Sequence, residues 1–332
     1  MKIVKSNTGL SIDKVDHVFN YLIHLKLRRN RAESTIRTYK KVLTQFQDFL
    51  SDKTVLDADE LDVIAFLNKN KISNHTFNLY KIVLSGFYKY LSKLDLSIDI
   101  TEEIFLQNIE KKIYKKPVSS FDIKKLWRFF QQRVDEATAS DKEIDLLKAM
   151  RNQVAFTLAA TTGLRPMSLC ELKKGDIAVL RSDEGDDVAG LSYKPKGKEN
   201  QFVPLEAPVM KYLEKYFDLR SDMSDSDFLI CSYSNRSYKA KMRTDSLRNI
   251  IISAFRFCGV QKEVNKQYIK FYSLRHTVGT KLTSEYGESI AQDILGHSSR
   301  ESTRHYNKLA RDQKILSSPP SMTKIYGIEE EE

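Results

Sequence analysis

Apolar and polar positions alternate with helical spacing over residues 13–95. The first predicted helix carries Val15, Val18, Phe19, Leu22 and Leu25. A stronger stripe predicts a helix over 34–50, with Ser34 or Thr35 as its N-cap. That stripe consists of Ile36, Tyr39, Val42, Leu43, Phe46, Phe49 and Leu50. Two more helices are predicted at about 58–69, with Leu61, Ile64 and Ala65, and at about 74–94, with Phe77, Tyr80, Leu84, Phe87 and Leu91 inward. Four helices with short connections predict a small all-α bundle.

The helical pattern stops at residues 108–120, NIEKKIYKKPVSS. We predict a linker there, because Pro117 interrupts a helix. A new helix is predicted from Ser119 or Ser120. Further on, an apolar helical stretch at 149–158 continues to a stop at Gly163, and Pro166 suits the first turn of the next helix.

Three strand-like runs follow at 176–180, 188–194 and 201–205, and helices are predicted at 206–219 and 244–258. The segment PKGKEN, at 195–200, predicts a hairpin turn that projects Lys196 and Lys198. The alternative interpretation is an ordinary solvent-exposed basic loop. These elements predict a mostly α fold with a small β-sheet, in which a helical bundle precedes a mixed α/β domain.

Composition narrows the class of protein. The chain has 332 residues, of which 41% are hydrophobic and 30% charged, so it can bury a sizeable core in about two domains. We expect no membrane span, because no run of about 18 apolar residues exists, and no secretory signal, because the N-terminus lacks an apolar segment. The three cysteines lie far apart without CxxC spacing. This excludes a disulfide scaffold and a cysteine-rich zinc site, and it fits the cytoplasm.

Charge favours a polyanionic partner. The net charge is +10, which in a cytoplasmic protein points to nucleic acid. Between residues 24 and 41, seven basic residues face one acid; they are Lys26, Arg28, Arg29, Arg31, Arg37, Lys40 and Lys41. Lys71, Lys81 and Lys89 form a second basic set. Such a surface suits phosphate contacts. For any single lysine, a solvated surface position is the alternative.

Two arginines stand in unusual local contexts. Arg165, in TTGLRPMSLCEL, is predicted in a tight turn between two buried helices, where a guanidinium must find a partner. A structural ion pair and an anion clamp both fit. Arg275 and His276, in SLRHTVGTKL, are predicted at the start of a helix, where backbone N–H groups favour anions.

The C-terminal part adds a histidine and a tyrosine. His297 follows Gly296 at a predicted helix end, and Tyr306 lies nine residues further on. Arg304, His305 and Lys308 flank this tyrosine. Such cationic neighbours are unusual for a tyrosine of the core.

Together these segments resemble the tyrosine recombinases, the family of phage integrases, Xer-type recombinases and archaeal integrases. The resemblance spans about residues 13–310. TTGLRPMSLCEL matches the first arginine box, KGKENQFVPL the hairpin box, SLRHTVGTKL the second arginine box, and LGHSS with STRHY the histidine and nucleophile boxes. The resemblance implies a core-binding domain at 1–107, a linker at 108–120, a catalytic domain at 121–310 and a tail at 311–332 that packs on a neighbouring protomer. A frayed tail is the alternative for this last segment.

The resemblance also implies the chemistry: a site-specific recombinase that cleaves and rejoins double-stranded DNA through a 3′-phosphotyrosine. Tyr306 would be the nucleophile, Arg165 and Arg275 would hold the phosphate, His297 would donate a hydrogen bond to it, and Lys196 would protonate the leaving 5′ oxygen. This sequence departs from the family at Tyr272, which replaces the usual histidine, and at Ser168, which replaces a frequent acid. We expect the Tyr272 hydroxyl to orient the phosphate. The DNA contacts would come from the basic cluster, Lys81 and Lys198.

Neither a metal nor another cofactor is expected, because no HExxH, EF-hand or P-loop motif occurs. The resemblance implies a dimer on each DNA site, a tetramer in synapsis and a nucleoid-associated location. Integration, excision and resolution fit the sequence equally well. Two alternatives stay open: a catalytically silent DNA-binding regulator, and a type IB topoisomerase or telomere resolvase with the same residue set.

Overall fold

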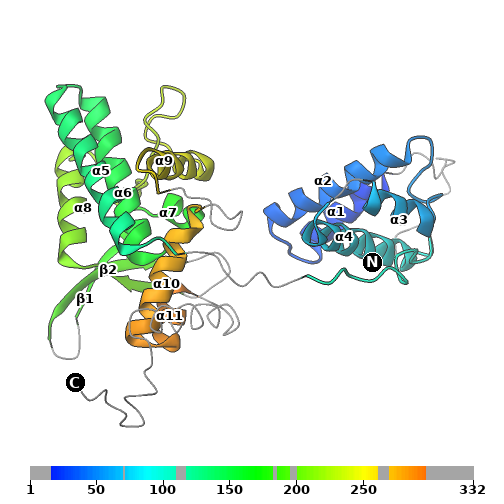
Figure 1. Cartoon of the computed structure of the whole chain (residues 1–332). Helices are drawn as coiled ribbons and strands as arrows, with labels where there is room; N and C mark the ends of the chain where they lie inside the picture. The colour runs from blue at the N-terminus through cyan, green and yellow to red at the C-terminus, as the bar shows by residue number, and fades with distance from the viewer. Residues whose placement is uncertain are drawn as a thin grey trace, which may run out of the picture. The chain divides into compact units, whose positions relative to one another are not determined.

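The computed structural model describes residues 16–69, 72–109, 117–181, 185–194, 200–260 and 269–296. The chain divides into two compact units, Met1–Lys112 and Ile113–Glu332, whose elements are labelled in Figure 1. Each unit has its own hydrophobic core. The domain boundaries inferred above stay predictions.

The N-terminal unit is the helical bundle that the hydrophobic pattern predicted. Its helices are α1 (His17–Leu27), α2 (Glu33–Leu50), α3 (Glu60–Asn68) and α4 (Asn74–Ser92). Their apolar faces meet in a core that contains the fully buried Phe46 and Phe87. Side chains at the helix starts provide the N-caps of α3 and α4, where Asp59 and Ser73 accept hydrogen bonds from the backbone.

Two local predictions in this unit were wrong. Helix α2 begins at Glu33 with Ala32 as its N-cap, rather than Ser34 or Thr35, because the backbone N–H of Arg31 bonds back to Leu25 and fixes the chain just before the helix. The buried residues of α3 are Val63, Phe66 and Leu67, whereas Leu61, Ile64 and Ala65 are exposed. This short helix is apolar on every side. Its orientation is set by packing of the Phe66 ring against those of Phe46 and Phe49, at 5.1 and 5.5 Å, and against Tyr80 of α4 at 5.7 Å.

The C-terminal unit, in which the chemistry is expected, is also mainly helical. Its helices are α5 (Ser120–Ala139), α6 (Glu143–Thr162), α7 (Pro166–Glu171), α8 (Ala207–Leu219), α9 (Thr244–Phe257), α10 (Tyr272–Tyr286) and α11 (Glu288–Leu295). As predicted, Ser119 caps α5, Gly163 ends α6 and Pro166 occupies the first turn of α7.

A three-stranded antiparallel sheet completes this unit. Its strands are β1 (Ile177–Arg181), β2 (Asp187–Tyr193) and β3 (Gln201–Pro204), in the order β1-β2-β3. In the β2–β3 hairpin, Tyr193 pairs with Gln201 as the last rung before the connection. The predicted strands and the mostly helical fold class are therefore confirmed.

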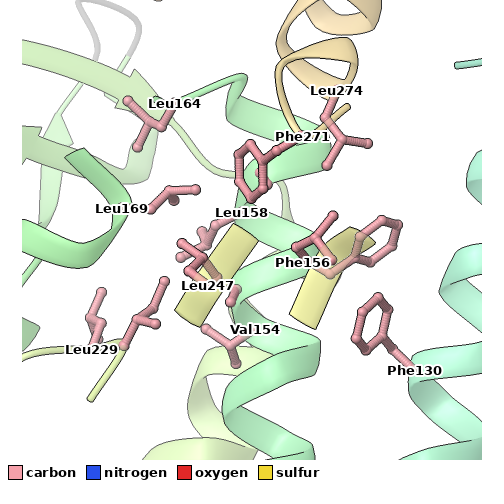
Figure 2. Packing of buried hydrophobic residues seen from close by; sticks show 14 of the residues in the cluster. Phe130, Val154, Phe156, Leu158, Leu164, Leu169, Leu229, Leu247, Phe271 and Leu274 are labelled. Atoms are coloured by element: carbon pink, nitrogen blue, oxygen red, sulfur yellow. The ribbon is translucent and has the colours of Figure 1, made fainter. Parts of the chain in front are cut away.

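The main core places the start of α10 against α6. Figure 2 shows Phe271 and Leu274 near Phe156 and Leu158 of α6, and all four side chains belong to one buried cluster. Trp127 packs at the edge of this cluster, and its indole N–H donates to the Tyr212 hydroxyl at 2.9 Å. This packing brings Arg275 of α10 close to the C-terminal end of α6.

Candidate active site

The turn after α6 favours a residue without a side chain. Gly163 has φ +64° and ends the helix in the left-handed conformation. A Cβ atom there would lie 2.9 Å from Leu295 Cδ2 and 3.1 Å from Val278 Cβ. Two residues later, the half-buried Arg165 is the N-cap of α7. Within the described residues Arg165 has no ion-pair partner, so the ion-pair interpretation finds no support there, while the anion clamp stays a prediction.

Arg275 lies at the centre of the arrangement. Its side chain is buried, with 3% of its surface exposed. One terminal nitrogen donates to the Gly163 carbonyl at 2.8 Å, and the other donates to the Leu295 carbonyl at 2.6 Å. Both carbonyls belong to helix C-termini, where backbone acceptors lack intrahelical partners and attract a cation. Arg275 therefore ties the turn that carries Arg165 to the end of α11.

The β2–β3 hairpin lies against the same place. Burial raises the pKa of the Tyr193 hydroxyl, while the positive charges of Arg275 and Arg165 act to lower it. Both guanidiniums therefore lie within electrostatic range of the hydroxyl at the end of β2. Tyr193 was not among the predicted site residues, because its place in a strand-like run carried no sign of the arginines.

Tyr272 is the first residue of α10, one turn before His276. The two ring centroids are 6.3 Å apart. Its side chain is 39% exposed, whereas the preceding Phe271 is buried in the main core. The Tyr272 side chain therefore does not share the buried environment of Phe271. A role for its hydroxyl stays a prediction.

Four predicted site residues, Lys196, Lys198, His297 and Tyr306, lie outside the described residues, as do Lys71 and the tail at 311–332. The described chain nevertheless reaches Lys194 on one side of the hairpin and Gly296 at the end of α11. The structure thus gathers Arg165, Arg275 and the segments that lead into the hairpin and histidine boxes.

The basic residues of the N-terminal unit line a groove of about 1040 Å³ between α1 and α4, to which α2 contributes Tyr39. Of the described residues that line it, none is acidic. Its cations are Arg28, Arg29, Arg31, Lys81, Lys89 and Lys93. Apolar side chains lie among these cations, including the exposed Ile23, Leu27 and Ile82. A groove with this lining suits a phosphate backbone and the apolar edges of bases.

The predicted DNA contacts fall into two groups. Arg28, Arg29, Arg31 and Lys81 line the groove. Lys26 instead lies 3.7 Å from Glu33 in an exposed ion pair, and Arg37, Lys40 and Lys41 are exposed on α2 outside the residues that line the groove. Lys93 was not predicted, because it ends α4 beyond the periodic stripe.

His24 lies in this groove beside aromatic rings. Its ring stacks on Tyr21, with centroids 6.5 Å apart, and lies 5.0 Å from the ring of Tyr90. Burial lowers the pKa of His24, and the nearby charges of Arg29, Arg28 and Lys93 lower it further. The protein therefore holds a neutral imidazole among its groove cations near neutral pH.

Membrane spans and metal sites can be judged for the described residues. No helix among them is long and apolar enough to cross a membrane. No group of three or more His, Cys, Asp or Glu side chains within these ranges could hold a metal ion.

The sequence also matches models of known families. Residues 136–313 match the phage integrase family, and residues 18–95 match the phage integrase N-terminal SAM-like domain. The chain belongs to the phage integrase family, whose members are tyrosine recombinases. The SAM-like match at 18–95 covers the helices α1 to α4, and the integrase match at 136–313 lies in the C-terminal unit.

Relatives of this integrase-family chain cover almost its full length. It is 27% identical over 303 residues to the tyrosine recombinase XerC of Staphylococcus aureus (strain MSSA476), with 88% of this chain and 92% of that protein covered. The fold resembles the XerH site-specific recombinase bound to palindromic difH substrate in a post-cleavage complex, at 21% identity and a TM-score of 0.63, covering 94% of this chain and 90% of that one.

A lambda integrase tetramer bound to a Holliday junction has the same fold, at 17% identity and a TM-score of 0.58, covering 86% of this chain and 77% of that one. With the family match and the XerC relationship, the chain is a site-specific tyrosine recombinase that cleaves and rejoins DNA. The predicted enzyme class is confirmed, and the silent regulator is set aside.

Proposed function

We propose that this recombinase cleaves one DNA strand by attack of the Tyr306 phenolic oxygen on the scissile phosphorus. The phenol passes its proton to water or a neighbouring side chain as the 3′-phosphotyrosyl bond forms. The bond from phosphorus to the 5′ oxygen breaks, and Lys196 gives the leaving oxygen its proton. The new bond keeps the phosphodiester energy, so rejoining reverses the step without ATP. We expect no metal requirement, because the proposed cations neutralise the phosphate charge themselves.

The arginine cluster supports this proposal most directly. Arg275 donates to the Gly163 carbonyl, two residues before Arg165, and to the Leu295 carbonyl, two residues before His297. Cations fixed before substrate arrives stabilise charge that develops on the non-bridging oxygens. Arg165 and Arg275 would hold those oxygens, and His297 would donate a further hydrogen bond.

Tyr272 would act as a hydrogen-bond donor to the phosphate. A phenol with a pKa near 10 is a poor base at neutral pH but a good donor. Its partly exposed ring stands one helical turn before His276, on the same helix as Arg275. We expect Tyr272→Phe to lose about tenfold in cleavage rate, or about 1.4 kcal/mol of transition-state stabilisation, and Tyr272→His to remain active. Parental activity in Tyr272→Phe would show that the hydroxyl does nothing.

The N-terminal groove between α1 and α4 would bind the DNA backbone next to the cleavage site. This assignment is supported by the groove lining, whose described residues include cations but no acidic side chain. The protein would assemble as a dimer on each site and as a tetramer in synapsis, with the tail at 311–332 on a neighbouring protomer. The tetrameric lambda integrase on a Holliday junction and XerH on a palindromic substrate support the assembly. Acting on DNA, the enzyme would be cytoplasmic and associated with the nucleoid.

The decisive experiment traps the covalent intermediate. A binding site is first selected from a pool of random duplexes, and a nick near the cleavage position then lets the short cut product diffuse away. The parent protein should give a DNA adduct on a denaturing gel with EDTA present. Tyr306→Phe should bind this DNA normally and give no adduct. An adduct of normal yield from Tyr306→Phe would refute the proposed nucleophile, and cleavage that needs magnesium would refute the metal-free mechanism.

A further inference from the structure

One side chain joins the β2–β3 hairpin to the end of α11. Gln201, the first residue of β3, accepts a hydrogen bond from the Tyr193 hydroxyl at 3.4 Å, and its amide nitrogen donates to the Asp293 carbonyl at 3.3 Å. Tyr193 and Asp293 are far apart in sequence, yet Gln201 contacts both. The two bonds are long, so the packing around the amide matters as much as the bonds themselves.

That packing involves a glycine. Gly296 ends α11 with φ +61° in the left-handed conformation. A Cβ atom on Gly296 would overlap the oxygen, nitrogen and carbon of the Gln201 amide. The amide therefore lies directly over the backbone at the position before His297. Arg275 holds the same helix end through the Leu295 carbonyl at 2.6 Å, so Gln201 contacts a backbone that is already fixed.

Chain connectivity gives this contact a consequence. Tyr193 and Gln201 form the last rung of the hairpin, and Lys196 follows Tyr193 by three residues. On the other side of the contact, His297 follows Gly296 directly. The last rung of the hairpin, which precedes Lys196, is thus bound to the end of α11, which precedes His297.

We infer that Gln201 is a positioning residue that sets the base of the β2–β3 hairpin against the end of α11, and thereby aligns Lys196 with the phosphate held near His297. This inference rests on the proposed role of Lys196 as the proton donor. Gln201 itself does not contact the reacting atoms. Its loss should act through the leaving group alone, because the arginine cluster keeps its own bonds.

A sulfur leaving group tests this role. In DNA with a 5′-bridging phosphorothioate at the cleavage position, the product is a thiolate, whose conjugate acid has a pKa near 8.5 and which leaves without a proton. We compare Gln201→Ala, Lys196→Ala and the parent on oxygen and sulfur substrates. Gln132→Ala is the matched control, because Gln132 bonds only Glu136 on the same exposed face of α5 among the described residues.

Gln201→Ala should cleave the oxygen substrate at least about tenfold more slowly, bind DNA normally, and cleave the sulfur substrate within about twofold of the parent. The double variant Gln201→Ala/Lys196→Ala should be no slower than Lys196→Ala alone, because both changes remove the same proton transfer. Gln132→Ala should match the parent on both substrates.

The outcomes distinguish the positioning role of Gln201 from the proton-donor role of Lys196. If Lys196→Ala is rescued by sulfur but Gln201→Ala is slow on both substrates or normal on both, the positioning role is wrong and the proposed mechanism stands. If sulfur fails to rescue Lys196→Ala, Lys196 is not the proton donor, and the inference about Gln201 is overturned with it.

Discussion

The N-terminal groove keeps its cations at the surface, whereas the catalytic unit buries arginines. Among the described residues of the N-terminal unit, no Lys, Arg, Asp or Glu is buried. The catalytic unit buries Arg151, Arg220 and Arg275, with 6%, 2% and 3% of their surfaces exposed. All three donate to fixed protein groups: Arg151 to the Cys231 carbonyl at 3.0 Å, Arg220 to Asp222 at 2.9 Å, and Arg275 to two helix ends.

A positive charge has a different role in the exposed groove than in the interior of the catalytic unit. An exposed cation is hydrated, is screened by salt and contributes to DNA affinity roughly independently of its neighbours. A buried cation has lost its water, so the protein groups around it must hold it in place. Substitutions in the groove should therefore change affinity without changing stability, while substitutions of buried arginines should change both structure and chemistry.

The largest effect is expected from Arg275→Ala. This change leaves the buried carbonyls of Gly163 and Leu295 without their donor, which should cost about 2–5 kcal/mol of unfolding free energy. Trp127, the single tryptophan of the chain, lies in the catalytic unit, so its fluorescence in urea reports this loss. Arg165→Ala is the control: it should abolish cleavage while changing stability by less than about 1 kcal/mol. Equal stability losses in both variants would contradict the distinction.

Gly163→Ala should have the next largest effect, about 1–3 kcal/mol by the same measurement, because the new methyl group meets Leu295 and Val278 in a left-handed turn. Gly259 offers a matched control, since it has φ +62° but nothing within 4 Å of the place where a methyl group would lie. Gly259→Ala should cost only about 1 kcal/mol of backbone strain. A similar loss for both would mean that the contact with α11 adds nothing.

In the groove, Arg28→Ala/Lys89→Ala should weaken DNA binding and lower the slope of log K against log salt by about 1.8, or 0.9 for each lost phosphate contact. The thermal unfolding temperature should not change, because both side chains are exposed. Lys40→Ala/Lys41→Ala removes the same charge from α2 outside the groove. A larger change of slope in that second pair would move the DNA contact from the groove to α2.

The smallest effect should come from pH. The pKa of His24 lies below its ordinary value, as does that of His17 in the same groove. Bound phosphate raises both pKa values, so binding takes up protons and strengthens as pH falls from about 7.5 to 5.5, by roughly threefold for each half unit of pKa change. The free protein should lose stability over the same range, because its unfolded state binds protons more readily.

His17→Gln/His24→Gln should remove this pH dependence of binding, measured by titration of DNA at constant ionic strength. His75→Gln is the control, because His75 lies on α4 outside the residues that line the groove. Unchanged pH dependence in the double variant would assign the effect to other groups.

Much of the fold could be predicted because its signals are local. Ser119 before α5, Gly163 after α6 and Pro166 in α7 mark helix ends through their own backbone chemistry. The buried face of α3 could not be predicted in this way, since the helix carries apolar residues on every side. Its orientation depends on Phe46 and Phe49, which lie on a different helix.

In the site, too, local motifs could be predicted and contacts between distant segments could not. Arg165 and Arg275 were identifiable from motifs, but the structure supplied what Arg275 binds, because carbonyls from two distant helix ends leave no trace in the sequence. Gln201 and Tyr193 were missed for the same reason. Their importance comes from contact with Asp293 and Gly296, which only the folded chain creates.

The two helix ends that hold Arg275 also set the electrostatic balance of the site. Each helix C-terminus carries roughly half a negative elementary charge, and α6 and α11 both present theirs to the same guanidinium. Together they offset part of its positive charge before any substrate is present. Arg275 should therefore attract stray anions less strongly in the free enzyme. Its affinity for a phosphate should depend on the direction from which the phosphate oxygen approaches, because the Gly163 and Leu295 carbonyls already fix the guanidinium. Arg165 is only half-buried and would carry most of the long-range attraction.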